Sequence, residues 1–321
     1  MLLELPDIGG TTTPLVLLVA LIVDAVLGDM PHVFRVVPHP VAWVGRAADW
    51  LEKRLNRPRR GARTRAVRGA LLVFGFAALA WALGVAVGAA LDGFASGWVI
   101  EAIVVAVLLA QRSLFDHARA VARALGEGGV EAGRDAVRHI VGRDPDRLDE
   151  EGVARAAIES VAENFADGVV APAFWYLLLG LPGLFLYKTV NTLDSMFGHR
   201  DARHAIFGIA PARFDDILNL APARLAAWMI AFAAVFLPRG RPRGAVRTMF
   251  RDAGKHSSPN AGWPEAAMAG ALGVALLGPR HYEGDRVDDP WLGEEFTAQA
   301  TPAHIRRALY VFAVACFIDF A

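Results

Sequence analysis

Residues 69–91 read GALLVFGFAALAWALGVAVGAAL, 23 positions without a charged side chain. Apolar and polar residues do not alternate along this run, so the pattern excludes a half-buried β-strand. An α-helix rises about 1.5 Å per residue, so a helix of this length spans roughly 30 Å, the thickness of the hydrocarbon core of a bilayer. The run predicts a membrane-spanning helix; a fully buried helix of a soluble protein is the weaker alternative.

The rest of the chain supports a membrane protein. Its 321 residues are 55% hydrophobic and 21% charged, and a soluble domain is usually about half apolar and about a quarter charged. Further apolar stretches are shorter, or are interrupted by charge, proline or glycine: 14–28, 98–110, 168–186, 221–237, 264–278 and 306–320. We predict an all-α polytopic integral membrane protein, one domain over residues 1–321. We expect roughly five to seven membrane segments, some of them broken or re-entrant.

Charge in the connecting segments predicts the orientation. Residues 53–68, KRLNRPRRGARTRAVR, are strongly basic, whereas residues 92–97, DGFASG, carry no cation. The positive-inside rule therefore places residues 29–68 in the cytoplasm and 92–97 outside. The charged, helical stretch 111–167 is predicted to be a large cytoplasmic loop. The net charge is zero, which gives no global field for nucleic acid, and the lone Cys316 excludes an intrachain disulfide.

Three carboxylates recur at helical spacing in ESVAENFADG, residues 159–168. Glu159, Glu163 and Asp167 stand at i, i+4 and i+8, so one helical face would carry all three. Like charges at this spacing repel by a few tenths of a kcal/mol per pair, which a divalent cation would offset. The alternative is a solvated helix face on which Arg155 pairs with Glu159.

Three more polar clusters lie at the ends of apolar stretches: KTVNTLDSMFGHR (188–200), FDDILNLAPARL (214–225) and RDAGKHSSPNAGWPEAAMAG (251–270). Ionisable residues at such positions are candidates for function by default. Carboxylates together with Lys and Arg suit Mg²⁺-bound phosphate. The P-loop, G-x-S-x-G and H-E-x-x-H motifs are absent. The residues alone predict a membrane-embedded, Mg²⁺-dependent enzyme that acts on a phosphorylated or phosphate-activated substrate.

Four segments together resemble the motif series of the CobD/CbiB family: DAVLGDMPHVFRVVPHPVAWVGR (24–46), ESVAENFADGVVAP (159–172), KTVNTLDSMFGHR (188–200) and RDAGKHSSPNAGWPEAAMAGALG (251–273). The family contains the adenosylcobinamide-phosphate synthases of cobalamin biosynthesis. The resemblance implies ATP-dependent amide formation between adenosylcobyric acid, a corrinoid, and an aminoalcohol phosphate such as (R)-1-amino-2-propanol phosphate. It also implies the cytoplasmic (inner) membrane as the location, with the active site facing the cytoplasm.

Within this reading, we expect each polar cluster to contribute to one site. The expected Mg²⁺ ligands are Glu159, Glu163, Asp167 and Asp194. The residues expected to hold ATP or phosphate oxygens are Lys255, Arg251, Arg200, Ser195 and Ser258. The expected catalytic residues are Glu163, His256, Glu265, Asn191 and Asn260, with His256 or Glu265 as the proton acceptor and the asparagines orienting an amide oxygen or oxyanion.

Two alternatives stay open at the level of sequence. One is a membrane Mg²⁺-dependent phosphoalcohol or prenyl transferase, although DGVVAP (167–172) lacks the arginine that the phosphoalcohol type requires. The other is an AmpE-like membrane sensor or a transporter without turnover, for which no internal repeat is visible. The expected partners are the two substrates and the lipid bilayer, without nucleic acid. The oligomeric state, as a homo-oligomer or in a complex with later cobalamin-assembly enzymes, is left open.

Overall fold

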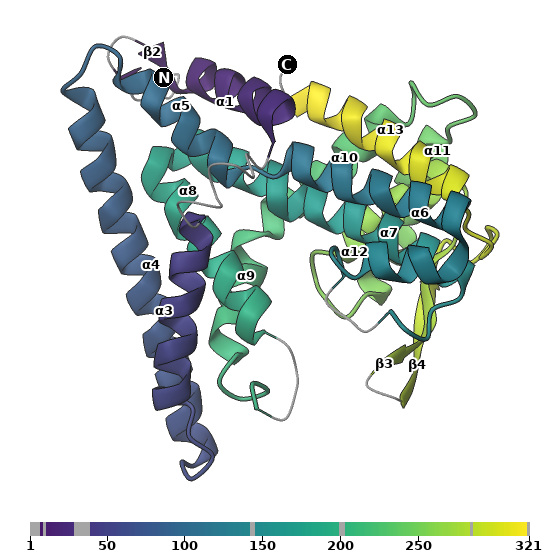
Figure 1. Cartoon of the computed structure of the whole chain (residues 1–321), viewed down its shortest axis with the longest axis horizontal. Helices are drawn as coiled ribbons and strands as arrows, with labels where there is room; N and C mark the ends of the chain where they lie inside the picture. The colour runs from purple at the N-terminus through teal and green to yellow at the C-terminus, as the bar shows by residue number, and fades with distance from the viewer. Residues whose placement is uncertain are drawn as a thin grey trace. The chain divides into compact units, whose positions relative to one another are not determined.

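The computed structural model describes residues 7–8, 11–28, 39–141, 145–198, 203–282 and 285–319, and most of them are helical (Figure 1). Long apolar and alanine-rich runs explain this content, because neither has the alternation that a sheet surface needs. The helices up to the middle of the chain are α1 (Thr13–Leu27), α3 (Pro40–Leu55), α4 (Ala62–Asp92), α5 (Gly97–Leu108), α6 (Gln111–Val137) and α7 (Glu150–Phe165). A π-helical turn, η1 (Ala166–Val170), joins α7 to α8 (Ala171–Phe197), and α9 (Ile209–Leu218), α10 (Leu220–Ala233), α11 (Pro242–Asp252), the 3₁₀ turn η2 (Ala253–Lys255), α12 (Gly262–Leu272) and α13 (Pro302–Asp319) follow.

Two short antiparallel strand pairs interrupt the helices. Strands β1 (Asp7–Ile8) and β2 (Thr11–Thr12) form the first pair, and β3 (Leu276–Tyr282) and β4 (Asp285–Leu292) form a hairpin. The chain is mostly helical, as the all-α prediction expects, and this hairpin is an exception to it. The apolar stretch 264–278 does not continue as a helix because Gly273, with φ of 72°, ends α12 in the left-handed conformation that glycine tolerates.

Among the described residues, several helical stretches are long and apolar enough to cross a bilayer. By length and composition, three described helical stretches qualify: Ala62–Asp92, Gly97–Val137 and Glu150–Phe197. A fourth is obtained if Ile209–Leu218 and Leu220–Ala233, which a bend separates, count as one broken span. The predicted five to seven segments included 264–278, but α12 has only 11 residues and covers about half of a hydrocarbon core.

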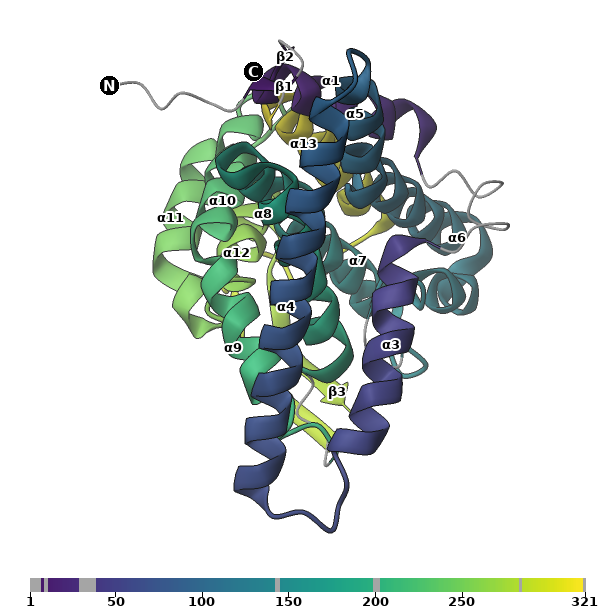
Figure 2. The same cartoon turned by 90° about the vertical axis from the view of Figure 1, so that its left-hand side faces the viewer.

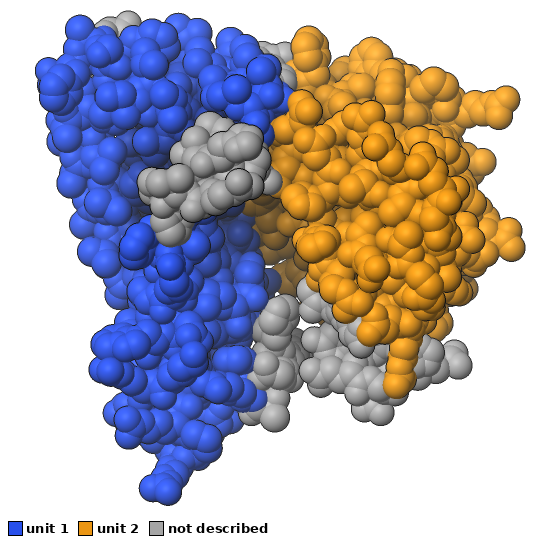
Figure 3. All heavy atoms as spheres, in the orientation of Figure 1, with its two compact units in different colours: residues 1–109, 171–218 blue, residues 110–170, 219–321 orange. Residues whose placement is uncertain are grey.

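The described chain packs as two compact units, which Figure 3 colours separately. Unit 1 contains residues 1–109 and 171–218, and unit 2 contains residues 110–170 and 219–321. The predicted loop 111–167 is helical, as expected, and falls within unit 2. The prediction that 1–321 forms one membrane domain stays a prediction.

In unit 1, α4 packs against α8. The two backbones approach closely at Gly84, where a Cβ atom would lie 2.5 Å from the Cα of Pro182. The opposite face of α4 is apolar and open, and Leu71 and Leu79 are each 67% exposed. Burying apolar area contributes about 25 cal/mol per Å², so a helix with this face is stable where lipid replaces water.

One carboxyl group lies deep inside unit 1. Glu101, on α5, has no exposed surface, and its Oε1 atom accepts a 2.7 Å hydrogen bond from the hydroxyl of Tyr176 on α8. Tyr176 is itself fully buried. A buried polar group needs such a partner, because leaving it without a hydrogen bond costs about 1–3 kcal/mol.

In unit 2, α12 is the central helix, and α7, α10 and α11 pack around it. All its residues except Trp263 are buried, which explains a sequence rich in alanine and glycine. The α11 and α12 backbones meet at Gly270, where a Cβ atom would lie 2.4 Å from the carbonyl oxygen of Gly244. This contact sets the spacing between α12 and the start of α11, and the candidate site lies at the opposite end of α11.

Candidate functional site

The stretch 251–265 forms the connection between α11 and α12 in unit 2. Helix α11 ends at Asp252, the 3₁₀ turn η2 follows, and His256 turns the chain into an extended conformation (φ −72°, ψ 144°). The chain changes direction before α12, which starts at Gly262. Pro264 lies in the first turn of α12, where a helix accommodates proline. Several predicted site residues are therefore brought into one compact connection.

Arg251 and Lys255 surround the carboxylate of Asp252, which has no exposed surface. Arg251 donates from Nε and Nη2 to the two oxygens of Asp252, and the Nζ atom of Lys255 lies 2.9 Å from Oδ1. The N–H of Gly293 donates to Oδ2 at 2.8 Å. The three donors compensate a charge that would otherwise be costly to bury.

A second carboxylate, Glu295, meets Arg251 from the other side. Arg251 donates from Nη1 and Nη2 to Glu295 at 2.8 and 2.6 Å, and both side chains are more than a third exposed. Four donor contacts of the guanidinium are thus engaged within the protein. Arg251 was predicted to hold phosphate, and in this structure an incoming anion would have to replace Glu295.

The electrostatics of this cluster favour ionised groups. Burial alone would raise the pKa of Asp252, but the hydrogen bonds from Arg251, the Gly293 N–H and Lys255 outweigh it and hold that pKa well below the usual range. Hydrogen bonds from Arg251 also lower the pKa of Glu295. Hydrogen bonds to Asp252 and Glu295 raise the pKa of Arg251. The cluster therefore keeps its charges throughout the physiological pH range.

A shallow pocket of about 360 Å³ opens beside the cluster. Its lining consists of two cations and two carboxylates: Arg251, Lys255, Glu294 and Glu295. Lys255 is 34% exposed, so its ammonium can still face a ligand. A small molecule that carries both an anionic and a cationic group matches this lining better than one with a single charge.

His256 and Glu265 lie next to this cluster along the chain, and their closest atoms, Nε2 and Oε1, are 3.8 Å apart. The backbone N–H of Ser258 donates to Nδ1 of His256 at 2.9 Å. In a neutral imidazole the proton then resides on Nε2, which faces Glu265, so the lone pair that would act as a base is already engaged. This geometry favours Glu265, an acceptor that is 3% exposed, over His256 as the proton acceptor.

The predicted residues Ser258 and Asn260 shape the turn before α12. The hydroxyl of Ser258 accepts hydrogen bonds from the N–H groups of Asn260 and Ala261 at 3.3 and 3.2 Å. The Oδ1 atom of Asn260 accepts a 3.1 Å hydrogen bond from Arg224, whose guanidinium stacks over Trp263 at 4.8 Å. Both residues hold the connection in shape, whatever else they bind.

Of the three predicted carboxylates, Glu159 and Glu163 lie on α7 and Asp167 lies in η1. Among the residues that the structure describes, no group of three His, Cys, Asp or Glu side chains is arranged to hold a metal ion. Glu159 is 7% exposed and accepts the N–H of Leu277 at 2.9 Å, and η1 widens the helix before Asp167. The predicted Mg²⁺ ligands Glu159, Glu163, Asp167 and Asp194 therefore stay a prediction.

The alternative of a solvated helix face agrees with the exposed Glu163, but its ion pair between Arg155 and Glu159 is not formed among the described residues. The carboxylate that Arg155 approaches, at 4.0 Å, is Glu151 and not Glu159. Arg155 also donates to the carbonyl of Ala298 at 2.6 Å. Glu163 is exposed and Asp167 is half-buried, so the accessible carboxylates of this helix end are these two.

The remaining predicted residues belong to unit 1. Asn191 donates from Nδ2 to Asp215 at 3.3 Å, and the hydroxyl of Ser195 donates to the carbonyl of Asn191 at 2.9 Å. The carbonyl of Asp194 accepts the N–H of Gly198 near the end of α8. Arg200 lies outside the described residues. Asn191, Asp194 and Ser195 thus share one helix turn, as their spacing predicts.

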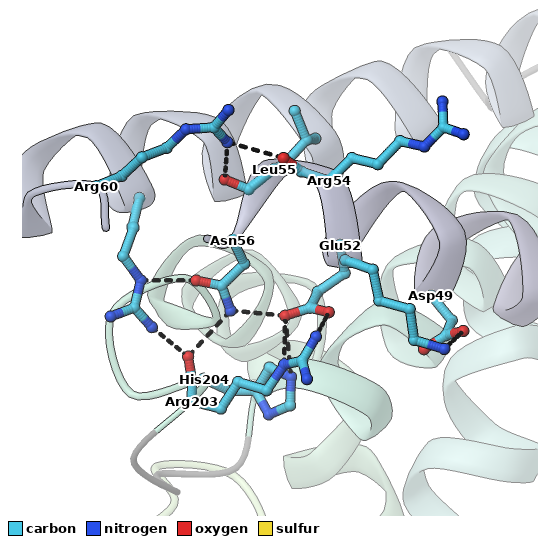
Figure 4. Close-up of polar contacts among 10 residues, drawn as sticks. Asp49, Glu52, Arg54, Leu55, Asn56, Arg60, Arg203 and His204 are labelled. Carbon is cyan, nitrogen blue, oxygen red and sulfur yellow. Dashed lines mark hydrogen bonds and ion pairs between the residues drawn. The ribbon is translucent and has the colours of Figure 1, made fainter. Parts of the chain in front are cut away.

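Sequence reasoning missed a polar network in unit 1 (Figure 4). Glu52, on α3 and 1% exposed, accepts from Nε of Arg203 at 2.9 Å and from Asn56 at 2.6 Å, and His204 lies 3.5 Å away. Burial would raise the pKa of Glu52, but the hydrogen bonds from Arg203 and Asn56 and the nearby charges lower it. The separation of Glu52 and Arg203 by 151 positions left no signal in the sequence.

Known proteins resemble this chain along most of its length. A family model described as "CobD/Cbib protein" matches residues 17–312, which is most of the chain. The chain belongs to the CobD/CbiB family.

Relatives of this CobD/CbiB protein cover nearly its whole length. "Cobalamin biosynthesis protein CobD" of Brucella suis biovar 1 is 48% identical over 301 residues, 93% of this chain and 92% of the relative. The protein of the same name from Sinorhizobium fredii is 49% identical over 305 residues, 94% and 93% of the two chains. That from Rhodobacter capsulatus is 45% identical over 296 residues, 92% and 91% of the two chains. No solved structure matches.

Membership of the CobD/CbiB family links the chain to cobalamin biosynthesis. The matched region covers most of both units and includes all the predicted site residues. Its apolar helices identify this CobD/CbiB member as a membrane protein by length and composition.

Proposed function

We propose that this CobD/CbiB protein is an ATP-dependent acid–amine ligase that forms adenosylcobinamide phosphate. Its substrates would be adenosylcobyric acid and an aminoalcohol phosphate such as (R)-1-amino-2-propanol phosphate. The family assignment supports a step of cobalamin biosynthesis, and the mixed-charge pocket beside Asp252 is the observation that carries the choice of step. The enzyme would reside in the cytoplasmic membrane with this pocket facing the cytoplasm, where ATP is available.

The pocket suits the aminoalcohol phosphate. This substrate carries a phosphate and an ammonium group a few bonds apart, and the pocket is lined by Lys255 and Arg251 on one hand and by Glu294 and Glu295 on the other. Phosphate entry would displace Glu295 from Arg251, which leaves this carboxylate for the ammonium. Exchange is feasible because an exposed ion pair contributes only about 0.2–1 kcal/mol.

Amide formation needs an activated acid, because a carboxylate is a poor electrophile. In the proposed reaction, an oxygen of the corrinoid carboxylate attacks the γ-phosphorus of ATP, and ADP leaves. The neutral amine then attacks the acyl carbon, the acyl–phosphate bond breaks, and phosphate leaves. Glu265 is the proposed acceptor of the amine proton, with the Nε2 atom of His256 at 3.8 Å placed to orient its carboxylate.

Mg²⁺ would fit here only if carboxylates, water and substrate phosphates shared its coordination shell. Mg²⁺ usually takes one or two carboxylates and completes its shell with water and substrate phosphates. The accessible Glu163 and Asp167 provide such a donor set, whereas Glu159 already accepts the N–H of Leu277. Bound there, the ion would neutralise charge on nucleotide phosphate oxygens. Asp194, Ser195, Asn191 and Arg200 stay proposed contributors on the strength of their sequence motif.

The test is turnover by the purified full chain in detergent. With Mg²⁺, ATP, adenosylcobyric acid and aminopropanol phosphate, we expect the amide product by mass spectrometry and one ADP per product by chromatography. Lys255→Ala and Glu163→Gln should each lower kcat/KM at least tenfold, because each removes a proposed contact with phosphate or its metal. Lys53→Ala and Glu131→Gln, at sites 62% and 80% exposed and remote in sequence, are the matched controls.

Absence of product with any aminoalcohol phosphate, from protein that elutes as a folded species, would overturn the proposal. Hydrolysis of ATP without amide product would argue for another phosphate-dependent reaction. Product formed by both variants at the wild-type rate would support the ligase activity and contradict the proposed site.

A further inference from the structure

A groove in unit 2 lies outside the candidate site. Its volume is about 450 Å³, and its wall is apolar apart from two arginines. Trp228, Phe232 and Val235 line one side, and Val246 lies on the other side with Arg243 and Arg247. The groove therefore combines an apolar wall with one side that carries two arginines.

Two helices form this groove. The apolar side belongs to α10 and to Val235, two residues beyond its end, and the side with the arginines belongs to α11, which packs beside α10 (Figure 2). Trp228 is 50% exposed, Phe232 is 54% exposed and Val235 is 57% exposed. Three large apolar side chains so exposed in one place would be unfavourable in water. A hydrocarbon occupant would cover them.

The arginines occupy the outer face of α11. Arg243 and Arg247 stand one helical turn apart and are exposed, while Ala245, Met249 and Asp252 turn inward. In the described part of the chain, no carboxylate forms an ion pair or hydrogen bond with either arginine. Two neighbouring cations without an internal counter-charge would bind an anion together, since guanidinium matches phosphate oxygens well.

We infer that this groove binds one anionic phospholipid, with an acyl chain along α10 and the headgroup phosphate between Arg243 and Arg247. A zwitterionic lipid brings its own cation to the headgroup and gains less from the arginines. A soluble phosphate gains nothing from Trp228, Phe232 and Val235. Basic pockets beside membrane helices favour anionic headgroups for the same electrostatic reason.

The experiment measures lipid preference in the full chain. Detergent-purified protein is equilibrated with equal amounts of phosphatidylglycerol and phosphatidylcholine, and retained lipid is counted by native mass spectrometry. Wild type should prefer phosphatidylglycerol, and Arg243→Ala/Arg247→Ala should lose most of that preference, roughly fivefold for each cation removed. Arg243→Lys/Arg247→Lys should keep it. Arg119→Ala/Arg123→Ala is the matched control, because these exposed arginines share the i, i+4 spacing on α6.

A second readout locates the lipid. Brominated phosphatidylglycerol should quench tryptophan fluorescence in wild type more than brominated phosphatidylcholine does, and Trp228→Phe should remove that difference. Equal retention of the two lipids by wild type would overturn the inference, as would equal losses in the α11 and α6 double variants. Detection of a stable dimer that excludes both lipids would overturn it in favour of a second copy of the chain.

Discussion

The ammonium of Lys255 lies 2.9 Å from the carboxylate of Asp252, and the two differ sharply in exposure: 34% for the Lys255 side chain and none for Asp252. The buried carboxylate anchors the cation at one side while its other side stays accessible. This arrangement pre-orders a flexible lysine, which otherwise loses up to about 2 kcal/mol of side-chain entropy when it is fixed on a ligand.

Asp252→Asn should weaken both the fold and the pocket. The change removes the charge that Arg251, Lys255 and the Gly293 N–H all contact, so we expect a loss of about 2–3 kcal/mol in the free energy of unfolding. Thermal unfolding in detergent measures it. Glu131→Gln, at an exposed ion pair on α6, should change stability by less than about 1 kcal/mol. Equal losses in the two variants would contradict the anchoring role of Asp252.

Glu295→Gln should act in the opposite direction on anion binding. It releases the outer side of Arg251, so affinity of the pocket for inorganic phosphate should rise, by up to about fivefold given the worth of an exposed ion pair. Titration calorimetry with phosphate measures this affinity. Weaker binding in Glu295→Gln than in wild type would show that Glu295 orients Arg251 rather than competing for it.

Acid should destabilise the chain, and neutral to mildly alkaline pH should not. The pKa values of Asp252, Glu295 and Glu52 are all lowered in the folded state. A lowered pKa gives stability that is present above the unfolded value and is lost as pH falls through the folded value. Unfolded Asp and Glu titrate near about 3.9 and 4.3, so the stability that these three groups contribute should be flat from about pH 6 to 8 and fall below about pH 4. A decline in the unfolding temperature that starts above pH 6 would assign the effect to other groups.

Glu52→Gln should destabilise unit 1. It removes a buried charge that accepts hydrogen bonds from Arg203 and Asn56, and we expect a cost of about 1–3 kcal/mol. Asp49→Asn is the control on the same helix, because Asp49 pairs with Lys53 at the surface and should matter by less than about 0.5 kcal/mol. The two unfolding curves are compared in one detergent. Coincident curves would show that the network does not contribute.

Gly270→Ala should force α11 and α12 apart. The new Cβ would lie 2.4 Å from the carbonyl oxygen of Gly244, well inside contact distance, so we expect about 1–3 kcal/mol of destabilisation. Gly75→Ala has open space within 4 Å and should be neutral or stabilising, since alanine favours a helix. Reduced phosphate binding by Gly270→Ala but not by Gly75→Ala would link this contact to the pocket.

Local patterns predicted the parts of this molecule that depend on neighbours in the chain. The apolar run 69–91 is a helix, and Arg251, Lys255 and His256 share one connection, because residues three to five apart on a helix end must lie close together. The role of Asp252 could have been suspected, since it stands between two of these cations. Asp252 is part of the quoted motif, but its burial was not predicted.

Long-range pairings could not be predicted in this way. Glu295 meets Arg251 across 44 positions, and Glu52 meets Arg203 across 151. The i, i+4 spacing of Glu159, Glu163 and Asp167 predicted a shared helix face. Spacing does not reveal that the N–H of Leu277 donates a hydrogen bond to Glu159, or that the π-helical turn η1 interrupts the α-helix. Tertiary hydrogen bonds, which periodicity does not reveal, determine which of these carboxylates are already engaged.

The buried hydrogen bond between Glu101 and Tyr176 has a consequence for biosynthesis. The two residues are 75 positions apart, so α5 leaves the ribosome several seconds before its partner exists, at about 5–20 residues per second. During that delay a carboxyl group in an apolar helix has no tyrosine to bind. Insertion of α5 should therefore be completed only when α8 arrives, and a nascent chain truncated before Tyr176 should be a better substrate for membrane quality-control proteases than one that includes it.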